Sequence, residues 1–250
     1  MSNRLKLLAS AALALAAVAS AQAAPAIRNI VLVHGAFADG SGWKAVSDIL
    51  TRDGYAVSIA QPPETSFEDD VAATNRLLDR LDGPAVLVGH SYGGMIISDA
   101  GNNAHVQALV YVAAFQPDVG DSPGKLLQSM PAASNSIAPS PDGFLYIAQA
   151  HFHADFAADL PQATADFMAR SQVGLSVKCL GATVATPAWK TKPSWAIVAK
   201  DDRAINPDLE RWMYKRSGAT TSEVAGSHAI YMSQAKAVAA VIEKAANAAK

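Results

Sequence analysis

Apolar residues along this chain gather in short continuous runs, and most of these runs are followed by a stretch with apolar residues at helical spacing. Short apolar runs bounded by turn residues are typical of strands buried on both faces of a sheet. The expected strands are 29–33, 56–60, 85–88, 108–114, 195–199 and 220–224, and the expected helices are 43–51, 67–81, 207–216 and those beginning at 94 and near 229. This alternation predicts an α/β fold with a mostly parallel, doubly wound sheet.

The alternation stops between Pro117 and Pro193, where prolines divide the chain into short pieces. Helical spacing is present within this region at 124–130, 143–150 and 161–173. Because the strand pattern resumes only at 195–199, the region predicts a modest insertion into one α/β domain.

The most informative stretch is Gly89-His90-Ser91-Tyr92-Gly93, which lies between an apolar strand and a helical pattern. A serine at such a sharp turn projects its hydroxyl above the carboxyl ends of the strands, and the two glycines avoid clashes across the turn. The free backbone N–H of Tyr92 at the start of the helix faces the same region. We therefore expect Ser91 to be a nucleophile and Tyr92 to contribute one oxyanion donor.

A second turn, His34-Gly35-Ala36-Phe37, follows the first strand. Its chemistry requires backbone donors, so we expect the Ala36 amide to complete the oxyanion hole and His34 to pack the turn.

A serine nucleophile needs a histidine as its base and an acid to orient that histidine. In hydrolases of this kind the three residues follow the chain in the order serine, acid, histidine. His228 is the only histidine after the last expected strand, whereas His90 and His105 are expected to be structural. The acid must follow a strand between the two, which leaves Asp201 and Asp202, with Asp118 as a weaker candidate.

Four segments carry a resemblance to a known family: VLVHGAFADGSGW at 31–43, VLVGHSYGGM at 86–95, VAKDDRAINP at 198–207 and AGSHAIYMSQ at 225–234. Together they resemble the α/β-hydrolase superfamily, in particular the small esterase branch that also contains plant methylesterases and hydroxynitrile lyases. The resemblance spans about 28–248. It implies an α/β-hydrolase fold with a small helical cap inserted after the sixth strand, at about 118–190. The family pattern D-R-A-I-x-P selects Asp202 as the acid, with Asp201 as the one-residue alternative.

These parts predict a serine hydrolase that cleaves a small carboxylic ester through an acyl-enzyme, without cofactor or metal. The spacing of His151 and His153 is one that metal sites use, but no carboxylate or cysteine cluster accompanies it. Apolar side chains of the insertion suit an acyl or aromatic group, and such residues are equally typical of a core. They are Met130, Phe144, Tyr146, Phe152, Phe156 and Trp189; from these and the first loop we name Phe37, Phe144, Phe152 and Trp189 as substrate-binding residues.

Some other activities of the superfamily are disfavoured by these residues, and others remain open. Haloalkane dehalogenases and epoxide hydrolases resemble this chain except for an aspartate at the position of Ser91. The hydroxynitrile lyases carry patterns similar to H-T and H-K at the positions where this chain has His34-Gly35 and His228-Ala229. This difference disfavours lyase activity. Perhydrolase, lactonase, thioesterase and amidase activities stay open, as does a slow or non-catalytic small-molecule receptor.

Composition and the N-terminus set the remaining limits. Arg4 and Lys6, the apolar stretch 7–19 and Ala21-Gln22-Ala23 predict a signal peptide at 1–23, a mature domain at 24–250 and a periplasmic or secreted protein without a stable membrane anchor. With 20 Lys and Arg against 22 Asp and Glu, nucleic acid is not an expected partner. Cys179, the single cysteine, cannot form an internal disulfide, and the oligomeric state is not predicted.

Overall fold

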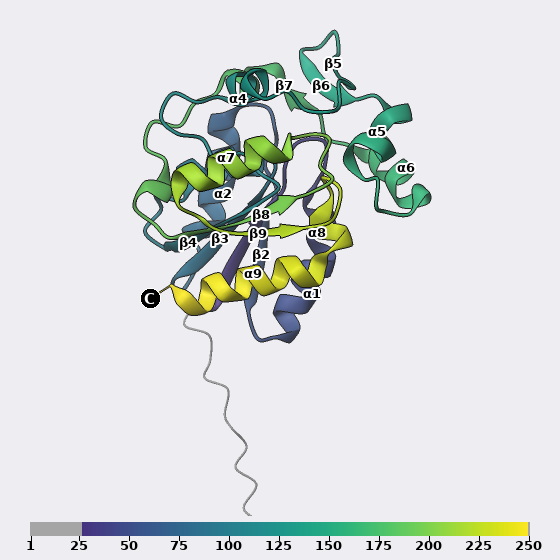
Figure 1. The fold of residues 1–250 in the computed structure, drawn as a ribbon. Coiled ribbons are helices and arrows are strands. Elements are labelled where there is room, and N and C mark those ends of the chain that lie inside the picture. Colours follow the sequence, from purple (N-terminus) through teal and green to yellow (C-terminus); the bar gives the residue numbers. More distant parts are fainter. Residues whose placement is uncertain (1–26, 250) are drawn as a thin grey trace, which may run out of the picture.

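Six parallel strands form the central sheet, in the order β2-β1-β3-β4-β8-β9 (Figure 1). The computed structural model describes residues 27–249, so the predicted signal peptide at 1–23 lies outside the described residues. The mostly parallel sheet predicted from the sequence is confirmed. Its strands are β1 Asn29–Val33, β2 Ala56–Ala60, β3 Ala85–His90, β4 Val106–Val112, β8 Ser194–Ala199 and β9 Thr220–Val224.

Helices cover both faces of this sheet. In Figure 1, α1 and α9 lie on one face and α2 and α7 on the other. Contacts place α3 beside α2. The single helix expected from residue 229 is divided at Gln234 into α8 and α9. The helices are α1 Lys44–Arg52, α2 Phe67–Leu78, α3 Gly93–Ala100, α7 Pro207–Ser217, α8 Ile230–Ser233 and α9 Ala235–Ala248, with the short 3-10 helix η1 at Gly40–Trp43.

Burial along the strands follows their place in the sheet. Every residue of the inner strands β1 and β3 is buried, in keeping with their continuous apolar sequences. The edge strand β9 reads Thr-Thr-Ser-Glu-Val and has no fully buried residue. Polar residues at this edge leave it solvated and discourage pairing with another chain.

The insertion lies between β4 and β8 and extends from the sheet at the upper right of Figure 1. Two features differ from the expectation. The insertion was expected after the sixth strand, but it follows β4, which is the fourth strand of the sheet in chain order within 27–249. The expected position came from the strand numbering of the family and not from strands counted in this sequence. It is also only partly helical, since β5, β6 and β7 form a three-stranded sheet with antiparallel pairing.

The helix expected at 143–150 is divided into a strand and the start of a helix. Phe144–Ile147 alternates half-buried and buried positions, which is the period of a strand, and α5 begins only at Gln149. The insertion contains α4 Pro123–Ser129, β5 Ile137–Pro139, β6 Phe144–Ile147, α5 Gln149–Phe156, α6 Gln162–Ser171, β7 Leu175–Ser176 and the 3-10 helices η2 Val177–Gly181 and η3 Ala188–Lys190. Among residues 27–249, no helix is both long and apolar enough to cross a membrane.

Candidate active site

Ser91 lies at the turn between β3 and α3, in a strained backbone conformation. Its φ is 53°, in the left-handed region that residues with a side chain rarely adopt. The flanking glycines make this turn sterically possible. A Cβ on Gly89 would lie 2.6 Å from the Gly93 carbonyl oxygen, and a Cβ on Gly93 would lie 2.7 Å from the His34 carbonyl oxygen. The sequence therefore builds the tight turn that was predicted.

A continuous chain of hydrogen bonds runs from Ser91 to Asp202. Ser91 Oγ lies 2.8 Å from Nε2 of His228, and Nδ1 of His228 lies 2.5 Å from Oδ2 of Asp202. The other carboxylate oxygen of Asp202 accepts hydrogen bonds from the amides of Ala204 and Ile205, at 2.7 and 2.8 Å. A carboxylate held in this way fixes one imidazole tautomer, with Nε2 free to accept a proton from the serine.

The parallel sheet brings these three residues together. Ser91 follows β3, Asp202 follows β8 and His228 follows β9, and the carboxyl ends of parallel strands share one edge of the sheet. The other acids considered from the sequence have different partners. Asp201 accepts a hydrogen bond from the Gly226 amide at 3.1 Å, and Asp118 lies 2.7 Å from Nζ of Lys190.

His90 contacts His228 through a hydrogen bond and through its ring. Its Nε2 donates to the His228 carbonyl oxygen at 2.9 Å, and the two rings are 4.6 Å apart between centroids. Burial, together with the neighbouring His228, holds the pKa of His90 well below its ordinary value. His90 is therefore neutral and fixes the backbone of His228. Elsewhere, His105 Nδ1 lies 3.1 Å from the Gly83 carbonyl oxygen and His153 Nε2 lies 3.0 Å from that of Leu160.

The two expected oxyanion donors lie at the same cavity as Ser91 and His228. Within residues 27–249, neither the Ala36 amide nor the Tyr92 amide donates to another protein group. Gly35 brings the first loop against the nucleophile, because a Cβ at this position would lie 2.6 Å from the Ser91 Cβ. Two unpaired amides beside a serine hydroxyl are the donors that an oxyanion requires.

The sequence pattern of the alpha/beta hydrolase family matches residues 30–241 of this chain. The chain belongs to this family. A carbendazim-hydrolysing esterase of Nocardioides sp. (strain SG-4G) is 33% identical over 109 residues, which cover 38% of this chain and 45% of that relative. Methylesterase 8 of Arabidopsis thaliana is 24% identical over 74% of this chain and 76% of its own length. The solved structure of a pyrethroid hydrolase from Sphingobium faniae JZ-2 matches with a TM-score of 0.77 and 24% identity, over 89% of this chain and 98% of its own.

An apolar cavity of about 170 Å³ lies over the Ser91 hydroxyl of this alpha/beta hydrolase. The insertion supplies much of its lining. Around Ala36, Phe37, Ser91, Tyr92 and His228, the lining residues are Phe115, Pro123, Leu127, Ile137, Leu145, Phe156, Leu175, Leu180, Ala204 and Ile205.

Of the four residues expected to bind substrate, Phe37 lines this cavity and the other three do not. Phe152 is fully buried behind Phe156, with ring centroids 4.9 Å apart. The Trp189 indole donates to the Pro117 carbonyl oxygen at 2.7 Å, away from the triad. Phe144 lies on the half-buried face of β6, and the strand alternation directs Leu145 into the cavity instead.

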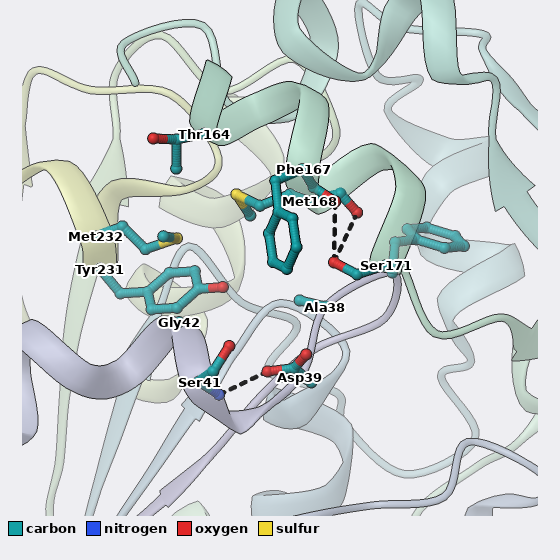
Figure 2. Close-up of a pocket in the computed structure, with 11 residues that line it drawn as sticks. Ala38, Asp39, Ser41, Gly42, Thr164, Phe167, Met168, Ser171, Tyr231 and Met232 are labelled. Atoms are coloured by element: carbon teal, nitrogen blue, oxygen red, sulfur yellow. Dashed lines mark hydrogen bonds between the residues drawn. The ribbon is translucent and has the colours of Figure 1, made fainter. Parts of the chain in front are cut away.

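A second hollow of about 100 Å³ lies on the other side of Phe37, which lines both spaces. Figure 2 shows that Phe167 and Met168 approach it from α6, and Tyr231 and Met232 from α8. Asp39 at the end of the first loop and Ser41 of η1 lie on the opposite side from α6. Phe37 has a φ of 65°, a strained backbone conformation that persists only where neighbouring contacts determine it. It is the residue common to the linings of the two spaces and therefore a wall that they share.

Glu210 is a site residue that the sequence analysis missed. It is fully buried on α7 beside Asp202, and its Oε2 accepts the Ala199 amide at 3.1 Å. Burial, and next the charge of Asp202, raise the pKa of Glu210 well above its ordinary value, which favours the protonated form of this carboxyl. A sequence signal was present, because Met213 and Tyr214 follow Glu210 at helical spacing on the same apolar face.

Proposed function

We propose that this protein is a carboxylic ester hydrolase in which Ser91 is the nucleophile, His228 the general base and Asp202 the acid of the triad. The single observation that carries this proposal is the hydrogen-bond chain from Ser91 Oγ through His228 to Asp202, at the floor of an apolar cavity. Ester hydrolysis is also the activity named for relatives of the same family.

Acylation begins when Ser91 Oγ attacks the ester carbonyl carbon and its proton passes to Nε2 of His228. Asp202 stabilises the imidazolium that results, since its carboxylate faces the Nδ1–H. The carbonyl oxygen becomes an oxyanion that accepts hydrogen bonds from the Ala36 and Tyr92 amides. The intermediate collapses as the alkoxy group leaves with the proton from His228, and an acyl-Ser91 ester remains.

Deacylation reverses these roles with water. His228 takes a proton from a water molecule, whose oxygen attacks the acyl carbon and forms a second oxyanion in the same place. When this intermediate collapses, Ser91 Oγ leaves and regains its proton from His228. The carboxylic acid is released and the protein returns to its starting state.

The cavity supports a small apolar ester as substrate. Its volume of about 170 Å³ and its largely aliphatic and aromatic lining fit an alkyl or aryl group but offer little to a charged one. A relative named for the hydrolysis of carbendazim supports hydrolysis of a small molecule.

Hydrolysis of p-nitrophenyl esters from acetate to octanoate, by the wild type and by Ser91→Ala, tests this function. We expect the wild type to turn over these esters and Ser91→Ala to lose as much as ~10⁶-fold in kcat. A wild type that binds small apolar molecules but hydrolyses none of the esters would instead support a receptor on the same fold.

We also propose that the protein is exported to the periplasm or secreted. The cationic start, the short apolar stretch at 7–19 and the Ala21-Gln22-Ala23 sequence support a cleaved signal peptide. N-terminal sequencing of the exported protein should begin at Ala24. A chain retained in the cytoplasm with Met1 intact would contradict the proposal.

A further inference from the structure

A cluster of buried polar side chains lies behind the first oxyanion loop, outside the triad. It consists of His34, Glu64, Asp70 and Tyr92, with exposures of 1%, 0%, 0% and 2%. Within residues 27–249, neither carboxyl forms an ion pair with a lysine or arginine. Burying two carboxyls whose only cationic partner is a histidine costs folding free energy. Their presence therefore suggests that they have a role.

The first arm of the cluster leads to Ala36. His34 Nδ1 lies 3.0 Å from the Gly35 carbonyl oxygen, which can only accept, so Nδ1 carries the proton. The Gly35 carbonyl and the Ala36 N–H belong to one planar peptide unit and point in opposite directions. Holding this carbonyl therefore fixes the direction of the Ala36 donor. Glu64 Oε1 lies 3.5 Å from the same Nδ1, at ion-pair rather than hydrogen-bond distance, so its negative charge favours a proton on this nitrogen.

The second arm leads to Tyr92. Its hydroxyl donates to Asp70 Oδ2 at 2.8 Å, which anchors the residue whose amide is the other expected donor. Asp70 Oδ1 accepts the Glu64 amide at 2.6 Å. Asp70 thereby links the two arms, because it binds both Tyr92 and the backbone of the residue that faces His34.

The backbone around this cluster is strained at three residues with side chains. Phe37, Glu64 and Ser91 have φ values of 65°, 59° and 53°. Such conformations persist only where neighbouring contacts determine them. Two contacts come from the insertion, since the Ser176 amide donates to the Glu64 carbonyl at 2.9 Å and the Phe37 amide donates to the Val173 carbonyl at 3.1 Å.

We propose that Glu64 and Asp70 are positioning residues that fix the two backbone donors of the oxyanion hole, Glu64 through His34 and Asp70 through Tyr92. The inference rests on the proposed ester hydrolysis. Neither carboxyl lines the cavity, so each acts through another residue rather than on the substrate. A small displacement of an oxyanion donor has a large effect on rate, which gives both residues a measurable contribution.

The electrostatics of the cluster add a readout that depends on pH. Burial raises the pKa of Glu64 to about 7 and that of Asp70 to about 6. Burial lowers the pKa of His34, but Glu64, together with the Gly35 carbonyl and Asp39, more than offsets this and the net pKa is raised. The other groups that face the cluster are the Cys179 thiol, whose pKa burial raises to about 11, and the carboxyls of Asp39, Glu68 and Asp69. Loss of the Glu64 charge below pH ~7 weakens the hold on His34.

Three variants and a control test the proposal. Tyr92→Phe removes one oxygen and keeps the backbone amide, while Glu64→Gln and Asp70→Asn remove charge at nearly constant volume. Asp69→Asn removes an exposed carboxylate from the same turn of α2 and is the control. We expect about a 10- to 100-fold loss of kcat with little change in KM in the three variants, and wild-type kinetics in the control. The wild-type loss of kcat on acidification through pH ~7 should also be smaller in Glu64→Gln.

Wild-type kcat in folded Tyr92→Phe would overturn the proposal, and this variant decides the matter if a buried carboxyl variant fails to fold. A loss of kcat that matches only the fraction unfolded at the assay temperature would also overturn it. The rate at which diisopropyl fluorophosphate labels Ser91 separates the two proposals. A wild type that neither hydrolyses esters nor labels at Ser91 contradicts the proposed function, whereas equal labelling of wild type and variants contradicts only the positioning role.

Discussion

The imidazole of His228 and the carboxylate of Asp202 face each other at 2.5 Å, between Nδ1 and Oδ2. The carboxylate is held on its other oxygen by two backbone amides of the loop after β8, at 2.7 and 2.8 Å. Both of its oxygens are therefore occupied, and the carboxylate cannot rotate away from the ring. The neighbouring Asp201 points elsewhere, toward the Gly226 amide. Of these two adjacent aspartates, only Asp202 therefore faces the imidazole of His228.

This pair of adjacent acids offers a matched comparison. Asp202→Asn presents an amide N–H to His228 and favours the wrong tautomer, so we expect kcat to fall by about 10⁴-fold. Asp201→Asn should stay within a few-fold of the wild type, because the partner of Asp201 is the Gly226 amide rather than the imidazole, and an asparagine oxygen can still accept from that amide. Steady-state hydrolysis of one p-nitrophenyl ester by both variants measures the difference. Equal losses in the two variants would argue against Asp202 as the triad acid.

Glu210 should tolerate an amide but not truncation. Because burial favours the neutral form of this carboxyl, an amide is a close substitute. Glu210→Gln keeps the volume and an oxygen acceptor for the Ala199 amide, and we expect near-wild-type stability and activity. Glu210→Ala leaves that amide without its partner and opens a cavity beside Asp202. We expect a loss of about 2–4 kcal/mol in the free energy of unfolding, measured by urea denaturation. A Gln variant as unstable as the Ala variant would show that the charged form is the one required.

The stability of the protein should decrease as the pH rises from about 4 to about 7. The folded-state pKa of Glu64, about 7, lies above its ordinary value of 4.5, so the native state binds more protons than the unfolded state in this window. Asp70, with a pKa of about 6 against 3.8, contributes in the same direction. Glu64→Gln removes one of these groups and should flatten the dependence. Urea unfolding of both proteins at pH 5 and 7.5 tests this, and parallel curves would contradict it.

The features predicted best from the sequence are those that depend on neighbouring residues in the chain. Ser91 and its two glycines form a turn whose sterics need no distant residue, and the order of strands then brings Asp202 and His228 to the same edge. The cavity lining was harder to predict, because the direction of Phe144 depends on whether 143–150 begins as a strand or a helix.

The buried carboxyls were also hidden in the sequence. Glu68, Asp69 and Asp70 are consecutive, and only the packing of α2 shows that the last of them is buried. Glu64 lies in a segment without regular structure, so no periodicity indicates that it faces His34. Long-range contacts decide the environment of these groups, and a single sequence carries little information about such contacts.

Phe37 should limit the length of the acyl chain, because it is a wall shared by the cavity over Ser91 and the second hollow beneath α6. Phe37→Ala removes this wall and joins the two spaces. Each methylene that then becomes buried contributes about 0.8 kcal/mol, or about fourfold in kcat/KM. We therefore expect the ratio of kcat/KM for octanoate to that for acetate to rise in Phe37→Ala.

Phe167→Ala is the matched control for this prediction. Phe167 lines only the second hollow and its side chain is 64% exposed, so its removal should leave the ratio near the wild-type value. Loss of the buried Phe37 ring also lowers stability, by about 3–5 kcal/mol, so both variants are assayed well below their melting temperatures. An octanoate-to-acetate ratio that stays at the wild-type value in folded Phe37→Ala would mean that the acyl chain leaves the cavity in another direction. An octanoate-to-acetate ratio that rises equally in Phe167→Ala would mean that the second hollow, rather than the Phe37 ring, limits the length of the acyl chain.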